Sequence, residues 1–413
     1  MLRQVLLSAA TIVILLAATA LTASPAGASL FEGLGHLPAG PSSSAAAVSA
    51  DGSVVVGNVP IAHPLEDGTA YYTYEAFRWT RSGGMAGLGA LADRNDCRAT
   101  GVSADGAVVV GTCMSVGPGW TMMNNEAFRW TQGTMTGLGF PSGMSNSSAV
   151  GVSGDGQAVI IDNFNFGTFG LSGSTWRWSP TASWESLNVQ GSARGVSRDG
   201  HVIIGYYFPH FFEEGEPAYA LRWTERDGTL FLNLLPGRNT AYAQDVSDDG
   251  SVVVGWDAYF PQRCIDPPGQ PGPDQAFRWT EALGTVGLGC LPGDNASEAL
   301  AVSADGTIVV GWSGMHALMQ GLSNKHAFIW TADDGMRDLL EVLRTDYAID
   351  MAGWTLTEAV DISADGRTIV GNGFNPEGHE EAWVAVIPEP ATLALVAAGL
   401  AVAATGRRRA IHP

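Results

Sequence analysis

The amino-acid sequence predicts an all-β fold: a seven-bladed β-propeller of four-stranded antiparallel blades, with the ring closed by the N-terminal strand. A Ser-x-Asp-Gly tetrapeptide occurs seven times, at spacings from 44 residues (Asp155 to Asp199) to 60 residues (Asp305 to Asp365). Strand-like segments follow each copy in the same order, which indicates stacked units that share one continuous core. The last copy lacks a fourth strand, whereas a strand-like segment without partners precedes the first copy.

The second copy shows the strand order of one repeat. Arg98–Ser103 and Ala107–Gly111 flank Ala104-Asp105-Gly106, and Asp-Gly between apolar runs predicts a hairpin because glycine accepts positive φ. After a variable loop, Glu126–Thr131 alternates as a third strand and Met135–Gly139 follows as a fourth. Four antiparallel strands in about 50 residues are typical of a propeller blade.

The two ends of the repeat array predict that the ring closes. The third strand of the last copy, Glu381–Val386, runs directly into the C-terminal tail. Leu30–Leu37 precedes the first copy and matches the fourth-strand pattern of Met85–Leu91. Pairing of this N-terminal strand with the last blade leaves no exposed sheet edge. The alternative, an open β-solenoid, requires polar capping repeats that the sequence does not show.

The N-terminus predicts export. Arg3 is followed by an apolar stretch from Val5 to about Ala23, and small residues lead to Ala28. This order is typical of a secretory signal peptide over residues 1–28, with an uncleaved anchor as the alternative. The predicted propeller then spans residues 29–387, a sorting segment spans 388–409 and a short tail spans 410–413.

The C-terminal tail has three parts. Pro388, Glu389 and Pro390 lead into the apolar segment Ala391–Gly406, and the three arginines Arg407, Arg408 and Arg409 follow. This tail resembles the PEP-CTERM sorting signal of Gram-negative bacteria that make extracellular polymeric substance. The resemblance implies recognition by exosortase-type sorting machinery, transient anchoring in the inner membrane through the C-terminal helix, and cleavage near the motif. A plain membrane anchor is the alternative.

The repeat itself resembles a second family. The strand Ala-Phe-Arg-Trp-Thr and the closing Gly-Leu-Gly are similar to the extracellular HAF repeat, which often accompanies the PEP-CTERM tail, and His326-Ala327-Phe328 is its one literal copy. The combined resemblance covers about Leu30 to Arg409, although copies three, four and six lack Gly-Leu-Gly. It implies an exported protein of the cell surface or extracellular matrix, associated with exopolysaccharide and biofilm, and it carries no catalytic residue.

Composition argues against several classes of function. The formal charge is -20, Lys325 is the only lysine, and no Lys/Arg cluster lies in the body of the chain, so nucleic acid is not a predicted partner. The eight histidines show no metal-ligand spacing, and Gly-x-Ser-x-Gly is absent. The Asp-Gly turns lack the further oxygen ligands of a calcium loop. We therefore predict no metal, no cofactor and no nucleophile motif.

The four cysteines predict disulfides, because an even number in an exported chain favours bridges over metal or catalytic sites. The hairpin register around Asp105-Gly106 places Cys97 almost opposite Cys113. Cys264 and Cys290 lie at the loop-side ends of the fifth repeat and form the second candidate pair.

A recurrent arginine in the third strand is predicted to be structural. An arginine beside aromatic residues can stack on them and pair with a carboxylate, which we favour over a ring of cations that binds an anionic polysaccharide. The positions are Arg78, Arg129, Arg177, Arg222 and Arg278.

Candidate ligand-binding residues lie between the second and third strands, on the face opposite the Asp-Gly turns. Loops on a rigid scaffold vary freely and commonly carry function. Aromatic side chains that could stack on sugars gather there, unless they fold inward over the loop base. They are Tyr71, Tyr72, Trp120, Tyr206, Tyr207, Phe208, Trp256, Tyr259 and Phe260.

Three functions remain open from the sequence. The first is a non-enzymatic, structural or carbohydrate-binding component of the exopolysaccharide matrix. The second is a polysaccharide hydrolase or lyase with its active site in the propeller funnel, which a funnel lined only by Val, Ala and Gly would exclude. The third is a protein-docking platform, for which the fold alone is weak support.

Overall fold

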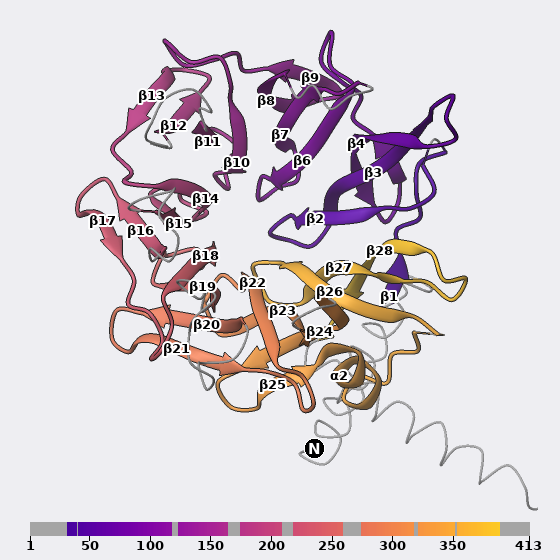
Figure 1. Cartoon of the computed structure of the whole chain (residues 1–413), viewed down its shortest axis with the longest axis vertical. Helices are drawn as coiled ribbons and strands as arrows, with labels where there is room; N and C mark the ends of the chain where they lie inside the picture. The colour runs from indigo at the N-terminus through magenta and orange to yellow at the C-terminus, as the bar shows by residue number, and fades with distance from the viewer. Residues whose placement is uncertain are drawn as a thin grey trace, which may run out of the picture. The chain divides into compact units, whose positions relative to one another are not determined.

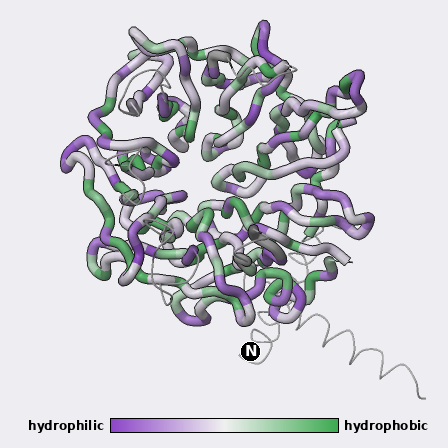
Figure 2. The backbone as a smooth tube through the Cα atoms, viewed as in Figure 1, coloured by the Kyte–Doolittle hydropathy of each residue, from purple (hydrophilic) through white to green (hydrophobic). Residues whose placement is uncertain are grey.

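The computed structural model confirms a seven-bladed propeller of four-stranded antiparallel blades (Figure 1). It describes residues 31–38, 40–117, 123–163, 174–208, 218–258, 274–317, 321–351 and 353–388. The predicted signal peptide, residues 1–28, lies outside these ranges. Along the backbone, hydrophobic residues recur within the strands and hydrophilic residues gather in the peripheral turns (Figure 2).

Each blade is one antiparallel meander whose first strand is the innermost. Blades 1 to 3 contain β2 (Ser44–Val48), β3 (Val54–Pro64), β4 (Ala70–Thr80) and β5 (Gly84–Gly87); β6 (Asp96–Val102), β7 (Val108–Ser115), β8 (Met123–Thr131) and β9 (Thr134–Gly137); and β10 (Ser148–Val152), β11 (Val159–Asn163), β12 (Ser174–Ser179) and β13 (Ser183–Leu187). Blade 4 contains β14 (Ser192–Val196), β15 (Val202–Tyr207), β16 (Tyr219–Thr224) and β17 (Gly228–Phe231).

The remaining blades follow the same order, with two additions. Blade 5 contains β18 (Thr240–Val246), β19 (Val252–Ala258), β20 (Gln275–Thr280) and β21 (Gly284–Gly289), and blade 6 contains β22 (Ala296–Val302), β23 (Ile308–Ala317), β24 (Gly321–Thr331) and β25 (Gly335–Asp338). The helix α2 (Leu339–Thr345) follows β25 directly. Blade 7 contains β26 (Thr355–Ile362), β27 (Thr368–Phe374) and β28 (Glu380–Val386), and its outer strand is the N-terminal β1 (Phe31–Gly33).

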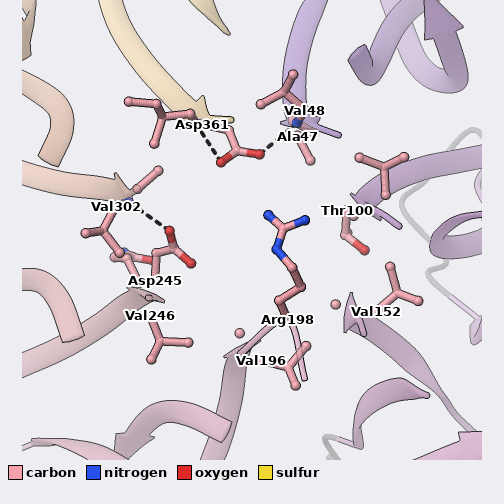
Figure 3. A pocket seen from close by; sticks show the side chains of 18 of the residues that line it. Ala47, Val48, Thr100, Val152, Val196, Arg198, Asp245, Val246, Val302 and Asp361 are labelled. Carbon is pink, nitrogen blue, oxygen red and sulfur yellow. Dashed lines mark hydrogen bonds between the residues drawn. The ribbon is translucent and has the colours of Figure 1, made fainter. Parts of the chain in front are cut away.

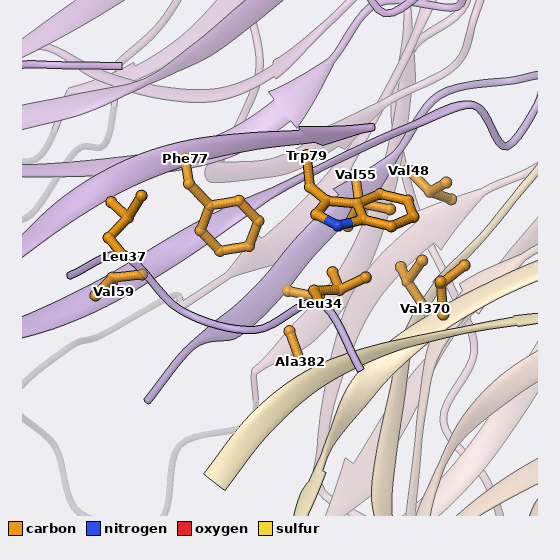
Figure 4. Close-up of a cluster of buried hydrophobic side chains, with 11 residues drawn as sticks. Leu34, Leu37, Val48, Val55, Val59, Phe77, Trp79, Val370 and Ala382 are labelled. Carbon is orange, nitrogen blue, oxygen red and sulfur yellow. The ribbon is translucent and has the colours of Figure 1, made fainter. Parts of the chain in front are cut away.

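The closing strand confirms the predicted ring, although it is shorter than Leu30–Leu37. β1 pairs with β28, with Phe31 opposite Ala385. Beyond the strand, the chain leaves the sheet and places Leu34 and Leu37 in an apolar cluster shared by blades 1 and 7 (Figure 4). The Leu34 N–H still donates to the Ala382 carbonyl at 2.8 Å, and the Gly35 N–H donates to Glu381 Oε1 at 2.8 Å. Hydrogen bonds to β28 and burial of the two leucines therefore hold this segment together.

The Ser-x-Asp-Gly tetrapeptides form the turns between the first and second strands. In the second copy, the Ser103 hydroxyl donates to Asp105 Oδ1 at 2.7 Å, and the Ala107 N–H donates to the same oxygen at 3.0 Å. The Val108 N–H donates to Ser103 Oγ at 2.9 Å, and Gly106 has a φ of 67°. The other six turns repeat this set, with serine–aspartate distances of 2.6 to 2.8 Å.

These turns also bond to one another around the ring. The residue between Ser and Asp donates its N–H to the carbonyl of the equivalent residue in the next blade. Six of the seven junctions carry this bond: Ala50 to Ala104, Ala104 to Gly154, Gly154 to Arg198, Asp248 to Ala304, Ala304 to Ala364 and Ala364 to Ala50, at 2.7 to 3.2 Å. Between blades 4 and 5, the side chains of Arg198 and Asp248 form an ion pair of 2.6 Å instead.

The recurrent strand arginine is structural, as predicted, but in four blades its acceptor is a carbonyl and not a carboxylate. The guanidinium donates to the glycine carbonyl of the next Asp-Gly turn in the pairs Arg78–Gly106, Arg129–Gly156, Arg222–Gly250 and Arg278–Gly306, at 2.8 to 3.3 Å. Arg177 instead lies 3.4 Å from Glu185 Oε2 in its own blade. The turns therefore accept bonds from the third strand of the preceding blade.

The cysteines divide into two cases. Cys97 lies directly opposite Cys113 in the β6–β7 pair, and the two form a disulfide. Cys290 is a free, half-buried thiol whose Sγ lies 3.6 Å from Ser297 Oγ. Its predicted partner, Cys264, lies outside the described residues.

We predict that Ser103→Ala lowers the free energy of unfolding by about 1–3 kcal/mol, because the buried Val108 N–H loses its acceptor. His201→Ala is the matched control, since His201 contributes only its backbone N–H to its turn and its side chain is exposed. The control should change stability by less than about 0.5 kcal/mol. Urea denaturation measures both, and equal effects would contradict the prediction.

We also predict that Phe31→Ala weakens the attachment of the closing strand β1 to blade 7. Phe31 is 6% exposed and its ring lies 5.3 Å from that of Trp354, so its removal should cost about 3–5 kcal/mol. Phe374→Ala, at a 40% exposed position of the same blade, is the control. Hydrogen exchange at the amides of β28 should accelerate only in the Phe31 variant.

Candidate functional site

The seven inner strands surround a central channel with a cavity of about 230 Å³ (Figure 3). Each inner strand (β2, β6, β10, β14, β18, β22 and β26) carries a β-bulge at the equivalent position. A bulge bends the strand and re-aims side chains. The residues at and after the bulges line the channel in all seven blades.

Two equivalent positions of the channel lining are small in most blades. The first residue after the bulge is Gly or Ala in five blades: Ala47, Gly101, Gly151, Gly195 and Ala301. Asp245 and Asp361 occupy this position in blades 5 and 7. In the turns, the residue between Ser and Asp is likewise small in five copies and is Arg198 or Asp248 in the other two. At these two positions, four charged residues therefore stand where the other blades have Gly or Ala: Asp245, Asp361, Arg198 and Asp248.

The two channel aspartates connect neighbouring blades. Asp361 Oδ2 accepts the N–H of Val48 from blade 1 at 2.7 Å, and Asp245 Oδ2 accepts the N–H of Val302 from blade 6 at 2.8 Å (Figure 3). Burial raises the pKa of Asp361 to about 7, with a further contribution from the charge of Asp245. Burial likewise raises the pKa of Asp245 to about 6.

Arg198 supplies the opposing charge. Its guanidinium projects into the channel on the side of Asp245 and Asp361 (Figure 3), and its Nε lies 2.6 Å from Asp248 Oδ2. The positive charge lowers the pKa of both channel aspartates but does not outweigh burial. Charged groups from blades 4, 5 and 7 thus converge on one side of the channel.

An aromatic cluster lies in blades 4 and 5, toward the face opposite the Asp-Gly turns. Tyr242 stacks on Trp256 at 4.5 Å and meets the edge of Tyr206 at 5.2 Å. Phe208 lies 5.3 Å from Tyr206. The guanidinium of Arg194, which lines the channel, lies 5.2 Å from the centre of the Tyr206 ring. We call Tyr206, Phe208, Tyr242 and Trp256 the aromatic cluster.

Comparison among blades shows that the fold does not require these rings. In blades 1, 2 and 7 the equivalents of Tyr206 and Trp256 are Asn58, Thr112 and Asn372. Each of the three accepts an N–H from the inner strand of the next blade, at 2.8 to 3.2 Å. Aromatic residues replace this polar link in three consecutive blades, as Tyr206, Trp256 and Trp312.

Blade 6 differs from blades 4 and 5 because its ring is covered. Trp312 is 2% exposed, and the Lys325 ammonium lies 4.4 Å from the ring centre and 3.4 Å from Glu358 Oε2. Trp312 Nε1 lies 3.3 Å from Glu298 Oε2, and burial raises the pKa of Glu298 to about 7. Trp312 is thus enclosed in a polar network, whereas the rings of blades 4 and 5 are partly exposed.

The structure places the predicted ligand-binding residues in several different environments. Tyr206, Phe208 and Trp256 belong to the aromatic cluster. Tyr207 stacks on Phe231 at 5.2 Å, Tyr71 stacks on His63 in blade 1 at 4.7 Å, and Tyr72 is 53% exposed. Five of these residues lie in strands rather than in loops: Tyr71, Tyr72, Tyr206, Tyr207 and Trp256. Trp120, Tyr259 and Phe260 lie outside the described residues.

Sequence reasoning missed Tyr242, Arg194 and the charged channel residues. Tyr242 lies in the inner strand β18 and not in a loop between the second and third strands. The available signal was the comparison of equivalent repeat positions, since the counterparts of Tyr242 in blades 1, 3 and 4 are Ser44, Ser148 and Ser192.

Within the described ranges, no three His, Cys, Asp or Glu side chains are grouped so as to hold a metal ion. None of the helices in those ranges is long and apolar enough to span a membrane. Of the predicted sorting residues, Pro388 ends the described chain, while Glu389, Pro390, Arg407, Arg408 and Arg409 lie beyond it.

Comparison with known proteins identifies the tail and the fold. The PEP-CTERM protein-sorting motif matches residues 386–409, and none of the curated proteins matches the chain. The β-propeller domain of the Trilobed protease from Pyrococcus furiosus is similar at 10% identity and a TM-score of 0.51, covering 83% of this chain and 95% of that one. Pyrococcus horikoshii acylaminoacyl peptidase is similar at 11% identity and a TM-score of 0.52, covering 86% and 53%. This chain therefore spans about half the length of that peptidase.

At such low identity these likenesses show the fold alone. The protein is thus a seven-bladed β-propeller that carries a PEP-CTERM sorting motif. The motif implies an exported protein that exosortase-type machinery sorts at a membrane.

We predict that the protein becomes less stable as the pH rises from about 4 to 7. An unfolded aspartate has a pKa of about 3.9, whereas burial raises that of Asp361 to about 7 and that of Asp245 to about 6. The folded state therefore binds more protons in this window, and each deprotonation costs stability. The Asp245→Asn, Asp361→Asn double variant should show a smaller fall in Tm between pH 5 and 8, whereas Glu377→Gln, at an exposed site, should keep the wild-type fall. An unchanged slope in the double variant would contradict this assignment.

Proposed function

We propose that this protein is an exported, non-enzymatic surface or extracellular-matrix component that binds exopolysaccharide through the aromatic cluster. The observation that carries the proposal is the replacement of a structural polar link by partly exposed rings in blades 4 and 5. Because other blades fold without these rings, the rings are available for a ligand. The similarity of the repeat to the HAF repeat, and the export that the sorting motif implies, support a glycan of the matrix as that ligand.

The chemistry of the site suits a carbohydrate. Sites for such ligands combine apolar or aromatic walls with a few polar groups that fix orientation. Here the rings of Tyr242 and Trp256 offer flat faces, while Arg194 and Gln244 line the adjoining channel and offer hydrogen-bond partners for hydroxyl groups. With a formal charge of -20, the protein repels polyanions at long range. We therefore expect a neutral or cationic glycan.

We predict that Tyr242→Ala weakens binding of the host's neutral polysaccharide about tenfold, equivalent to about 1.4 kcal/mol. Affinity falls because the variant lacks the ring face on which the sugar stacks. Tyr72→Ala removes a 53% exposed ring outside the cluster and should leave the affinity within about twofold. Affinity electrophoresis of the purified full chain in matrix polysaccharide measures both variants. Loss of binding in Tyr72→Ala alone would place the site in blade 1.

A polysaccharide hydrolase or lyase is the second candidate, because the channel is not lined only by Val, Ala and Gly. Arg194, Arg198, Asp245 and Asp361 converge there from three blades. We prefer the binding function over the enzyme because Asp361 and Asp245 already accept backbone N–H groups of neighbouring blades. These bonds give the two aspartates a structural role in joining blades. Release of reducing ends or unsaturated sugars that Asp361→Asn abolishes would favour the enzyme. The propeller fold also fits a docking role, and capture of one specific protein without glycan would favour that alternative.

A further inference from the structure

The junction between blades 6 and 7 departs from the repeat at the strand arginine. In four other junctions this arginine reaches the glycine carbonyl of the next turn, as Arg278 reaches Gly306 at 3.0 Å. In blade 6 the equivalent residue is Ile329, which cannot make this bond to Gly366. Ile329 and Gly366 instead line a cavity of about 370 Å³. We call this cavity the exit groove.

Two further departures converge on the same groove. Within the described ranges, blade 6 alone has a helix after its outer strand, and this helix, α2, contributes Val342 to the groove wall. Asp338 caps this helix by accepting the Glu341 N–H at 3.1 Å, which fixes where it begins. Tyr347, just after the helix, adds an aromatic side chain to the lining.

The chain also leaves the propeller at this groove. The buried Ile387 donates its N–H to the Arg367 carbonyl at 2.7 Å, and Ile387 and Pro388 both line the groove. The sorting motif matches from residue 386 onward. A segment tethered at the edge of a groove has a high effective concentration there.

The groove matches the chemistry of the motif. Pro388-Glu389-Pro390 favours an extended polyproline conformation, because each proline restricts itself and the residue before it. Such segments dock in apolar grooves with aromatic walls, and here Ile308, Ile329 and Tyr347 supply that wall. Two arginines and three aspartates line the groove. Arg337 pairs with Asp346 at 2.6 Å, Arg367 Nε lies 4.0 Å from Asp365 Oδ2, and Asp334 is the third acid. Arg367 is the arginine beside the point where the chain leaves the propeller, because its carbonyl accepts the Ile387 N–H.

We propose that the exit groove binds the Pro388-Glu389-Pro390 motif of the chain itself, with the prolines against the apolar wall and the Glu389 carboxylate beside Arg367. The folded propeller thereby holds the start of its own sorting signal. The groove exists only when blades 6 and 7 are assembled, so this contact couples the environment of the motif to completion of the ring.

Hydrogen–deuterium exchange of the full chain in detergent micelles tests the proposal. The reporter is a tail peptide whose one exchangeable motif amide is that of Glu389, because proline has no N–H. In the wild type this peptide should exchange several-fold more slowly than an unstructured peptide of the same sequence. Ile329→Arg should fill the groove by donating to Gly366, as Arg278 does to Gly306, and it should raise the exchange of this peptide several-fold. Arg278→Ile opens the corresponding site between blades 5 and 6, away from the tail, and should leave the exchange unchanged.

A second variant keeps the proposal testable if Ile329→Arg fails to fold. Glu389→Ala lies outside the propeller, so the fold remains while the charge partner of Arg367 is lost. It should raise exchange both in the tail peptide and at groove amides near Arg367. Exchange of the wild-type tail at the rate of the free peptide, or no response to either Ile329→Arg or Glu389→Ala, would overturn the proposal.

Discussion

The hydrogen bonds of the Ser-x-Asp-Gly turn organise the rest of the molecule. In each turn a buried serine accepts an N–H from the second strand while the aspartate fixes the serine hydroxyl and a second N–H. The residue between them bonds to its counterpart in the next blade at six of the seven junctions. The strand arginine of the preceding blade reaches the same turn at four junctions. One tetrapeptide therefore connects strands within a blade and blades within the ring.

This arrangement limits what can line the channel. Because seven turns and seven bulged inner strands meet around a narrow axis, two equivalent positions there, the first after the bulge and the one between Ser and Asp, are Gly or Ala in five of the seven blades. A charged side chain at such a position needs compensation. Asp245 and Asp361 obtain it from N–H groups of the neighbouring blades, and Arg198 obtains it from Asp248. The channel charges are thus stable exceptions that also join blades.

Several departures from the repeat lie in blades 4 to 6. Blades 4 and 5 replace a polar link by the aromatic cluster, and blade 6 replaces the strand arginine by Ile329 and adds a helix. Blades 1 and 2 keep both the polar link and the arginine. The regular blades provide rigidity, so the irregular ones can carry binding surfaces without loss of the ring.

The sequence by itself determined the local elements and their order. Asp-Gly pairs such as Asp105-Gly106 specify tight turns, alternation specifies the strands, and the missing last strand together with the segment before Ser44 specifies closure of the ring. These features follow from backbone sterics and strand periodicity, which act over a few residues. The tail motif is equally local, because its three parts are contiguous.

Only the tertiary structure decided which side chains meet. Tyr206 and Trp256 were identifiable as candidates, but their contact with Tyr242 joins two blades, and it depends on how inner strands face one another. The carbonyl acceptors of the strand arginines, and the convergence of Asp245, Asp361 and Arg198, depend on the same packing. Residues about 50 to 300 positions apart become neighbours through ring closure, as when Asp361 meets Val48 across 313 positions. Local periodicity carries no information about such contacts, because the curvature of the ring sets them.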